Sequence, residues 1–186
     1  MLEVHGLVHD QGWLADRDTI YLDPDTGEPH PTPGSLQIVF CDQGTPGDGR
    51  SFDLYTELHR QLVARGMPEQ AIRFMQDAKT DQQKAALFDA CDTGQVAVII
   101  GSTPTMGTGV NIQTRARRLI HLDVPWRPAD LIQREGRILR QGNQNPEVDI
   151  VAIVTERSFD AYMWQTVERK LRFIQQIMRA DLDRRD

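Results

Sequence analysis

Apolar residues in this chain gather in short continuous runs that alternate with segments of helical spacing. Runs of four to eight apolar residues between turn signals are typical of strands buried on both faces of a sheet. The run QVAVIIG at residues 95–101 is the strongest of them. On this pattern the sequence predicts five strands, at 36–41, 71–75, 95–101, 118–123 and 148–154.

The segments between these runs carry helix signals. Leu54, Leu58 and Leu62 recur every four residues, which places them on one side of a helix. Thr80 and Gln83 match a capping box, which predicts that a helix starts just after Thr80. Helices are therefore predicted at 51–65, from 81 to about 91, at 129–139 and at 158–178.

Strands that alternate with helices predict an α/β fold, with a parallel sheet covered by helices on both faces and a long C-terminal helix. Ligands of open parallel sheets bind beyond the carboxyl ends of the strands. The loops after Cys41, Gly101 and Asp123 are therefore where we expect the chemistry. The pattern divides the chain into a turn-rich lead-in segment at 1–35, a lobe at 36–157, and a C-terminal helix and tail at 158–186.

Composition places the chain among globular proteins of reducing compartments. Of its 186 residues, 39% are hydrophobic, which is enough for a core. Cys41 and Cys91 stand alone without a C-x-x-C pair, and the start of the sequence lacks the basic region of a secretory signal. No apolar run approaches the ~20 residues that span a bilayer. We therefore expect a cytoplasmic protein with buried cysteines and no membrane contact.

Charge is distributed unevenly along the chain. The formal net charge is −6, which argues mildly against general nucleic-acid binding. Residues 1–112 hold 7 Lys and Arg against 16 Asp and Glu, whereas residues 113–186 hold 14 against 11. Almost all the basic residues in the second part are arginines, which suit bidentate phosphate contacts better than lysines do. A solvated surface is nevertheless the simpler interpretation for most of them.

A glycine-rich loop, GSTPTMGTGVN at residues 101–111, follows the strongest strand. Its hydroxyls, glycines and backbone N–H groups could line a phosphate-bearing ligand. An ordinary glycine-rich turn explains the same residues equally well.

A second segment, QREGRILRQG, starts at Gln133. On a helix, one face would present Gln133, Arg137 and Arg140, while Ile138 and Leu139 would turn toward packing. The first glycine of the segment leaves room for a close approach. A surface face of salt bridges could look similar, but the preceding glycine-rich loop favours a site.

These two segments resemble motifs of superfamily-two helicases. The second matches each fixed position of motif VI, Q-x-x-G-R-x-x-R, and the glycine-rich loop matches S-T-x-x-x-G-x-G-x-N, motif V of the Swi/Snf branch. The resemblance extends over about residues 35–178, and the run GRILRQGNQNPE with SFDAYMWQTVERK further resembles the helicase region of bacterial proteins that fuse an adenine-specific DNA methylase to a helicase. One departure is the end of motif VI, where Swi/Snf enzymes have R-I-G-Q and this chain has R-Q-G-N from Arg140.

The resemblance implies a RecA-like second motor lobe of an ATP-dependent DNA helicase or translocase, braced by the last helix. ATP and Mg²⁺ would be held mainly by a first RecA-like lobe, with DNA and an adenine-specific DNA methylase domain as further partners. Arg137 and Arg140 would be catalytic arginines that reach ATP across a cleft, Arg140 being the finger. The implied nucleotide contacts are Gln133, Gly107, Gly109, Asn111 and Gly136, and the implied DNA contacts are Ser102 and Thr103.

The complementary half of an ATPase site is absent from the sequence. No G-x-x-x-x-G-K-[ST] loop and no D-E-x-[HD] run occurs in it. None of the three lysines, Lys79, Lys84 and Lys170, follows a glycine. We therefore expect this chain alone to be inactive as an ATP hydrolase.

Two further pairs of residues, one in a loop and one near the start of the chain, have spacings that could serve a ligand. Lys79 and Thr80, in the loop before the capped helix, could meet a DNA backbone, although capping already explains Thr80. His5 and His9 have the i, i+4 spacing of a helical metal pair, but no carboxylate partner lies nearby in the sequence. No metal site is predicted.

Four aromatic residues outside the motifs are expected to pack in the protein. Trp126 could stack on a base, but packing between elements is the simpler expectation for a residue between a strand and a proline. Tyr162, Trp164 and Phe173 on the last helix are expected in the core rather than on a docking surface.

Two functions compete with the motor lobe. A degenerate lobe that binds DNA or a protein would keep the fold, but it would have no need of the trio Gln133, Arg137 and Arg140. A free-standing nucleotide-binding regulator is disfavoured by the missing phosphate loop. The motor lobe is therefore the leading hypothesis, with the degenerate lobe as the alternative.

Overall fold

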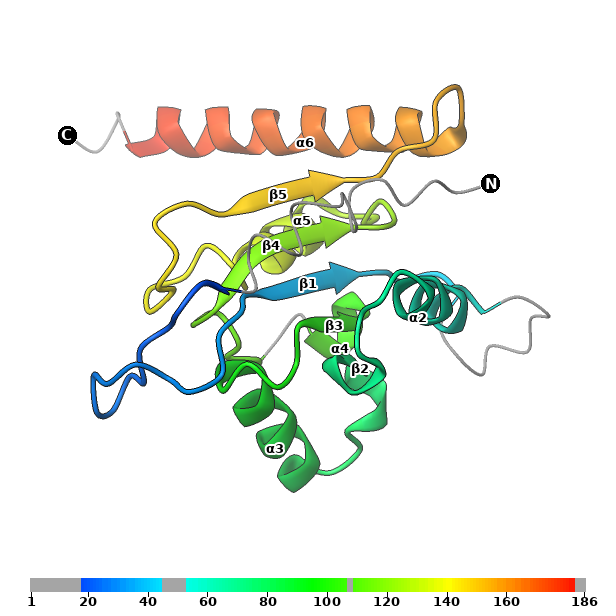
Figure 1. The fold of residues 1–186 in the computed structure, drawn as a ribbon. Helices are drawn as coiled ribbons and strands as arrows, with labels where there is room; N and C mark the ends of the chain where they lie inside the picture. The colour runs from blue at the N-terminus through cyan, green and yellow to red at the C-terminus, as the bar shows by residue number, and fades with distance from the viewer. Residues whose placement is uncertain (1–17, 45–52, 107–108, 183–186) are drawn as a thin grey trace.

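Five parallel strands form one sheet in the part of the chain that the computed structural model describes, residues 18–44, 53–106 and 109–182 (Figure 1). The order across the sheet is β2-β3-β1-β4-β5. These strands overlap the five predicted runs, and the predicted α/β fold is confirmed. The strands are β1 Leu36–Phe40, β2 Ile72–Phe74, β3 Val98–Gly101, β4 Ala116–His121 and β5 Asp149–Ala152.

The helices begin where the sequence supplies caps. The Asp53 side chain accepts hydrogen bonds from the N–H groups of Tyr55 and Thr56, and the predicted capping box of Thr80 and Gln83 is confirmed. Two short 3₁₀ segments flank β2, η2 Glu69–Ala71 and η3 Met75–Asp77. The helices are α2 Leu54–Ala64, α3 Asp81–Asp92, α4 Thr103–Met106, α5 Pro128–Glu135 and α6 Phe159–Leu182.

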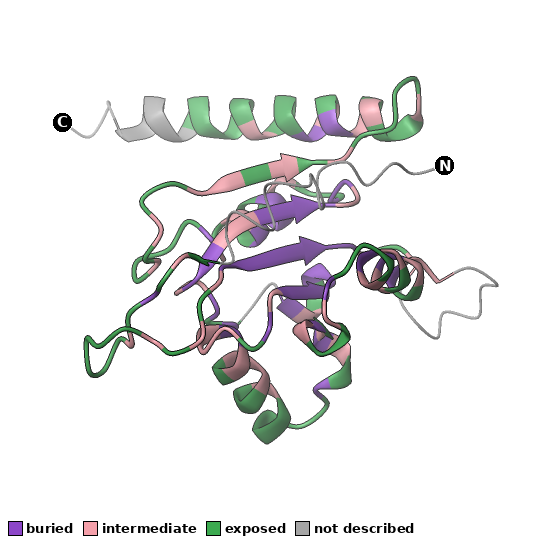
Figure 2. Ribbon diagram, viewed as in Figure 1, coloured by how far each residue is buried: buried purple, intermediate pink, exposed green. Residues whose placement is uncertain are grey.

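Helix α2 covers one face of the sheet, and α3 and α4 cover the other. Successive side chains of a strand point to opposite faces. Val39 of β1 accordingly lies in a core cluster with Leu58 of α2, whereas Ile38 lies in a cluster with Cys91 of α3 and Met106 of α4. The central strands are almost wholly buried (Figure 2), and Cys41 and Cys91 are free and buried as expected.

The strand ends are in register at the carboxyl edge of the sheet. Phe40 of β1 pairs with Gly101 of β3 on one side and with His121 of β4 on the other. The loops that follow these three strands therefore leave the sheet at the same level. This register is what brings distant parts of the sequence together at one site.

Helix α5 ends earlier than predicted, at Glu135 instead of Leu139. The N–H of Arg137 donates to the carbonyl of Arg134 in a tighter turn (3.0 Å). The carbonyl of Ile138 accepts from the side-chain amide of Asn143 (3.1 Å), which replaces the helical partner it would otherwise have. Arg137 and Arg140 therefore do not extend a helical face, and Leu139 is exposed, contrary to prediction, although Ile138 is buried as predicted.

The long predicted C-terminal helix is confirmed as α6, but only one side of it packs. Trp164 and Val167 are buried in a cluster with Leu131 of α5. Tyr162 and Phe173 are exposed, because they lie on a different side of the helix from that buried pair. The expectation of a core position was thus right for Trp164 and wrong for the other two aromatic residues.

The described part of the lead-in segment contains turns, as predicted, and it also packs on the lobe. Tyr21 is buried, donates from its hydroxyl to the Asn145 side chain (2.7 Å), and lies beside the Arg115 guanidinium. Arg115 in turn donates to the carbonyl of Thr32 (2.7 Å). The domain boundary at residue 36 stays a prediction. Residues of the lead-in segment, which precede that boundary, contact the lobe. None of the helices described is long and apolar enough to cross a membrane.

Candidate functional site

The loops after β1, β3 and β4 meet around the side chain of Arg134. This residue lies on α5 and is 0% exposed. Its Nε donates to Thr103 Oγ1 (2.8 Å), and its Nη1 donates to the carbonyl of Asp123 (3.1 Å). Its Nη2 lies 3.0 Å from Asp123 Oδ1 and 2.9 Å from Asp42 Oδ2. The buried guanidinium is thus paired with two carboxylates, as a charge removed from water must be.

The two carboxylates extend this network to the backbone of the loops. Asp42 accepts from the N–H of Thr103 (2.5 Å) and from its hydroxyl (2.9 Å). Asp123 Oδ2 accepts from the N–H groups of Asp42 (2.5 Å) and Gln43 (2.9 Å). We call Asp42, Thr103, Asp123 and Arg134 the Arg134 network. It fixes the three loops relative to one another.

The sequence predicted a site at the carboxyl edge of the sheet, but it did not predict the role of Arg134 at the centre of that site. The three loops that were expected to carry chemistry do come together, whereas Arg134 was not singled out. A usable signal was present, because Leu131, Arg134 and Ile138 follow one another at spacings of three and four, and Leu131 and Ile138 are apolar residues that are buried. An arginine at such a position needs carboxylate partners, and Asp42 and Asp123 directly follow strand runs.

His121 lies against the network in a neutral form. Its side chain is 1% exposed, and its Nδ1 lies 3.4 Å from Arg134 Nη1. Burial lowers the pKa of His121, and the Glu135 carboxylate partly opposes that shift. A neutral imidazole whose Nδ1 accepts a hydrogen bond fits this neighbourhood, since a protonated ring would place a second cation beside Arg134.

The folded state should therefore lose stability as the pH falls through the ordinary histidine pKa of 6.5. Because the folded His121 binds a proton less readily than the unfolded one, protons favour the unfolded chain below that pH. We expect a lower melting temperature at pH 5.5 than at pH 7.5. In His121→Asn, whose side-chain oxygen can still accept from Arg134, this difference should shrink. An unchanged pH dependence in that variant would assign the effect to other groups.

Arg137 and Arg140 converge on the end of the glycine-rich loop. Nη1 of Arg137 donates to the carbonyl of Val110 (3.1 Å), and Nη1 of Arg140 donates to Asn111 Oδ1 (2.6 Å) and lies 3.5 Å from the same carbonyl. Burial, and then the charge of Arg140, lowers the pKa of Arg137. Two guanidinium groups held this close form a site that an anion would stabilise.

The glycines near these arginines leave the site open. Gly109 is exposed with φ +69, a left-handed backbone conformation that favours glycine, and no atom lies within 4 Å of where its Cβ would be. A Cβ on Gly136 would meet only carbonyl oxygens of its own turn. Gly107 lies outside the described residues. The nucleotide contacts expected of Gly109, Asn111 and Gly136 stay predictions.

Gln133 faces a different hollow from the two arginines. A cleft of about 470 Å³ runs between the start of α4 and the loop before α5. Trp126, which was expected to pack between elements, is 65% exposed beside it, because Val124 and not Trp126 turns into the protein to meet Leu131. The cleft is lined by Asp42, Thr103, Pro104, Trp126, Arg127, Asp130 and Gln133.

The two residues expected to touch DNA from the glycine-rich loop are buried and engaged within the protein. Both donors of Thr103, its N–H and its hydroxyl, are given to Asp42. The N–H of Ser102 donates to the hydroxyl of Thr105 (3.0 Å). A DNA phosphate could use Thr103 only after displacing the Asp42 carboxylate, so this contact stays a prediction for another state of the site.

Lys79 and Thr80 lie in the loop that leads into α3. Lys79 is exposed, and the Thr80 side chain is used for the cap. The first turn of α3 borders a pocket of about 330 Å³ together with Thr105 and Gly109 of the glycine-rich loop. Lys79 precedes this turn in the sequence, and its DNA contact stays a prediction.

Comparison with known proteins assigns this fold and site to a family. A family model described as the helicase conserved C-terminal domain matches residues 34–142, more than half of the chain. This chain belongs to the helicase C-terminal domain family. The match spans β1 to the end of the arginine segment, and so it includes both motifs and the Arg134 network.

Two curated relatives match part of this chain. Defense against restriction protein B of Escherichia phage P1 is 36% identical over 73 residues, which is 39% of this chain and 3% of that protein. The uncharacterized ATP-dependent helicase YqhH of Bacillus subtilis strain 168 is 31% identical over 90 residues, which is 48% of this chain and 15% of that protein. The chain thus matches only a small part of either relative.

A solved structure has the same fold. The C-terminal part of the Fun30 ATPase domain superposes with a TM-score of 0.54 at 19% identity, covering 72% of this chain and 39% of that one. This likeness confirms the RecA-like arrangement of the helicase lobe.

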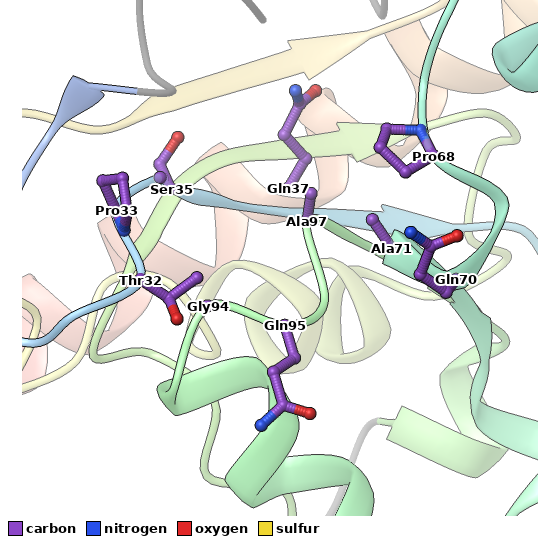
Figure 3. Close-up of a pocket in the computed structure, with 11 residues that line it drawn as sticks. Thr32, Pro33, Ser35, Gln37, Pro68, Gln70, Ala71, Gly94, Gln95 and Ala97 are labelled. Carbon is purple, nitrogen blue, oxygen red and sulfur yellow. The ribbon is translucent and has the colours of Figure 1, made fainter.

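A further hollow in the helicase domain lies at the opposite, amino edge of the sheet (Figure 3). It has a volume of about 330 Å³, and Gln37 projects from β1 among Ser35, Pro68 and Ala97. No charged residue lines it. The guanidinium of Arg115 lies behind Thr32 and Gly94, but it is buried and donates to the Thr32 carbonyl. The less buried arginine pair of the helicase motif is therefore the better candidate for a phosphate-bearing ligand.

No group of three or more His, Cys, Asp or Glu is placed to hold a metal ion among the described residues. His5 and His9 lie outside those residues. The described part of the helicase domain therefore offers an arginine pair that fits an anionic ligand, but no ligand set that fits Mg²⁺.

Proposed function

We propose that this chain is the second motor lobe of an ATP-dependent DNA helicase or translocase of the Swi/Snf type. Membership of the helicase C-terminal domain family supports a motor lobe in general. The match of the sequence to motif VI and to motif V of the Swi/Snf branch supports the narrower assignment to that type. The ATP-dependent activity belongs to the full-length protein, in which a first lobe would complete the site.

The observation that carries this proposal is the convergence of Arg137 and Arg140 on the Val110–Asn111 end of the glycine-rich loop. That loop leaves the carboxyl end of β3, which is the edge of the sheet where open α/β folds bind their ligands. Hydrolysis of ATP builds up negative charge around the transferred γ-phosphoryl group, and catalysis consists mainly of positioning and neutralising it. Planar guanidinium groups suit that task because they bind phosphate oxygens in pairs.

Other residues would complete the nucleotide site from this lobe. Arg140, the more exposed of the pair, would reach the γ-phosphate, and Arg137 would support it from beneath. Gly109 and Asn111 would border the nucleotide, and Gln133 would respond to closure of the two lobes. When bound, Mg²⁺ would neutralise phosphate charge from the first lobe, since the described residues here do not fit it.

DNA contact by this lobe should be weak, independent of sequence and dependent on salt. The net charge of −6 opposes long-range attraction, so local phosphate contacts must supply the affinity. The affinity of the chain for random-sequence duplex should fall with log salt, with a slope of about −0.9 for each phosphate neutralised. Lys79→Gln should reduce that slope by about one.

Lys170→Gln serves as the matched control for this measurement, because Lys170 is an exposed lysine on α6, away from the glycine-rich loop. Titrations of labelled duplexes at several salt concentrations give the slopes. Equal slopes for the wild type and Lys79→Gln would remove Lys79 from the DNA contact. Tight binding to a single sequence would favour the alternative of a DNA-binding module.

An adenine-specific DNA methylase domain is proposed as a partner in the full-length protein. The proposal is supported by the resemblance of the segment after Gly136 to methylase–helicase fusions. The similar protein of Escherichia phage P1 is named for defence against restriction. Methyl transfer to adenine by the full-length protein, measured with labelled donor, tests the association.

The motor function itself is tested by ATP hydrolysis in the full-length protein with and without duplex DNA. We expect DNA to stimulate hydrolysis. A well-folded full-length protein that binds DNA but does not hydrolyse ATP would support the degenerate lobe instead.

A further inference from the structure

The glycine-rich loop touches the α5 segment at two separate points. At its start, Thr103 accepts a hydrogen bond from Arg134 (2.8 Å). At its end, Val110 accepts from Arg137 (3.1 Å). Arg134 and Arg137 are only one turn apart along the chain. A shift of Thr103 relative to α5 would therefore move Arg134, and through the turn that follows it Arg137, over a short distance along the chain.

Arg134 is built into this contact more rigidly than the two arginines of the motif. It is 0% exposed, and all three of its guanidinium nitrogens have partners within 3.1 Å. The ring of Phe40 lies beneath the guanidinium, 5.3 Å from its carbon. A planar fork held on this many sides has one orientation, which a lysine cannot reproduce.

The partners of Arg134 include the group that DNA would have to displace. Thr103 gives both donors to Asp42, and Asp42 Oδ2 also lies 2.9 Å from Arg134 Nη2. A phosphate that takes either Thr103 donor breaks a hydrogen bond to Asp42. Asp42 then keeps Arg134 as its charged partner, while Asp123 holds the other side of the guanidinium. Binding of a phosphate to Thr103 would thereby change the hydrogen bonds that hold α5 in place.

We propose that Arg134 is a positioning residue that couples contact at the Thr103 loop to the placement of Arg137 and Arg140. The inference rests on the proposed function and deepens it, because it assigns DNA stimulation of hydrolysis to the Arg134 network. Arg134 touches neither ATP nor DNA in this account. It acts through Thr103 on one side and through the turn that carries Arg137 on the other.

The test is Arg134→Lys in the full-length protein. Lysine keeps the charge next to Asp42 and Asp123 but loses the fork that reaches Thr103. Displacements of about 1 Å at supporting residues cost on the order of a hundredfold in rate. We therefore expect the maximal DNA-stimulated kcat to fall on the order of tenfold to a hundredfold. The unstimulated kcat should fall much less than the stimulated kcat, and the DNA concentration for half-maximal stimulation should stay close to that of the wild type.

Arg118→Lys is the matched control, since Arg118 on β4 is ion-paired with Asp149 away from the site. It should leave both rates unchanged. Equal loss of the stimulated and unstimulated rates in Arg134→Lys would mean that Arg134 is merely structural and would overturn the proposal. Full stimulation in a folded Arg134→Lys protein would overturn it as well.

A second pair of variants decides the matter if Arg134→Lys does not fold. Thr103→Ser keeps the hydroxyl that accepts from Arg134, and Thr103→Val removes it with little change in shape. We expect the maximal stimulation at saturating DNA to persist in Thr103→Ser and to be lost in Thr103→Val. Persistence in both overturns the coupling. Absence of any DNA-stimulated hydrolysis in the wild type contradicts the proposed function instead, and with it the coupling.

Discussion

Replacing Arg140 with alanine in the full-length protein is expected to lower the kcat of ATP hydrolysis by about a thousandfold or somewhat less. Arginines supplied across a cleft contribute on the order of 10³–10⁵ in rate in nucleotide hydrolases. The lower end is expected here because Arg137 lies beside Arg140 and shares the carbonyl of Val110 with it. Arg137→Ala should have an effect in the same direction.

Stability and DNA binding should change little in Arg140→Ala. Arg140 is exposed, and the contacts it makes are to Val110 and Asn111 at the surface. Steady-state hydrolysis beside thermal melting separates the two effects, with Arg118→Ala as an arginine control away from the site. Unchanged kcat in both Arg137→Ala and Arg140→Ala would remove the catalytic role. A collapsed melting temperature would instead make these arginines structural.

The second large effect is expected on stability, from Asp123→Ala. Removing one partner of a buried ion pair costs about 3–5 kcal/mol, and we expect the lower end here because Arg134 keeps Asp42 as its second carboxylate partner. Asp123 holds Arg134 through one oxygen and the N–H groups of Asp42 and Gln43 through the other. Burial raises the pKa of Asp123, with Arg134 opposing the rise, so this carboxylate depends on its partners to stay charged.

Urea unfolding of the chain measures this cost. Asp149→Ala is the matched control, because Asp149 pairs with Arg118 while its side chain is 44% exposed. Exposed pairs contribute about 0–1 kcal/mol. A loss in Asp123→Ala no larger than that in Asp149→Ala would show that the Arg134 network does not hold the loops together.

Hydrophobic pattern was sufficient to predict the sheet. The central strands β1 and β3 lie in nearly continuous apolar runs because they are buried on both faces, whereas β2, β4 and β5 also carry charged residues such as Arg73, Arg118 and Asp149. The cap of α3 could be predicted from Thr80 and Gln83 because both partners lie within four residues of each other. The carboxyl edge could be predicted as the site because it follows from strand direction alone.

The features that were missed depend on contacts between distant residues. The end of α5 at Glu135 is set partly by Asn143, whose amide takes the carbonyl of Ile138, and no local signal marks this. The pairing of Arg134 with Asp42 joins α5, which follows β4, to the loop after β1, and these two residues lie far apart in the sequence. Trp126 was expected to pack because it lies between a strand and a proline, whereas Val124, two residues earlier, fills that space.

The central claim is that this lobe holds one half of an ATPase site, and hydrolysis by the purified 186-residue chain tests it most directly. The chain, the full-length protein and full-length Arg140→Ala are compared with and without duplex DNA. We expect background hydrolysis by the chain, DNA-stimulated hydrolysis by the full-length protein, and loss of most of that stimulated hydrolysis in Arg140→Ala. DNA-stimulated hydrolysis by the chain alone, abolished by Arg140→Ala, would contradict the half-site.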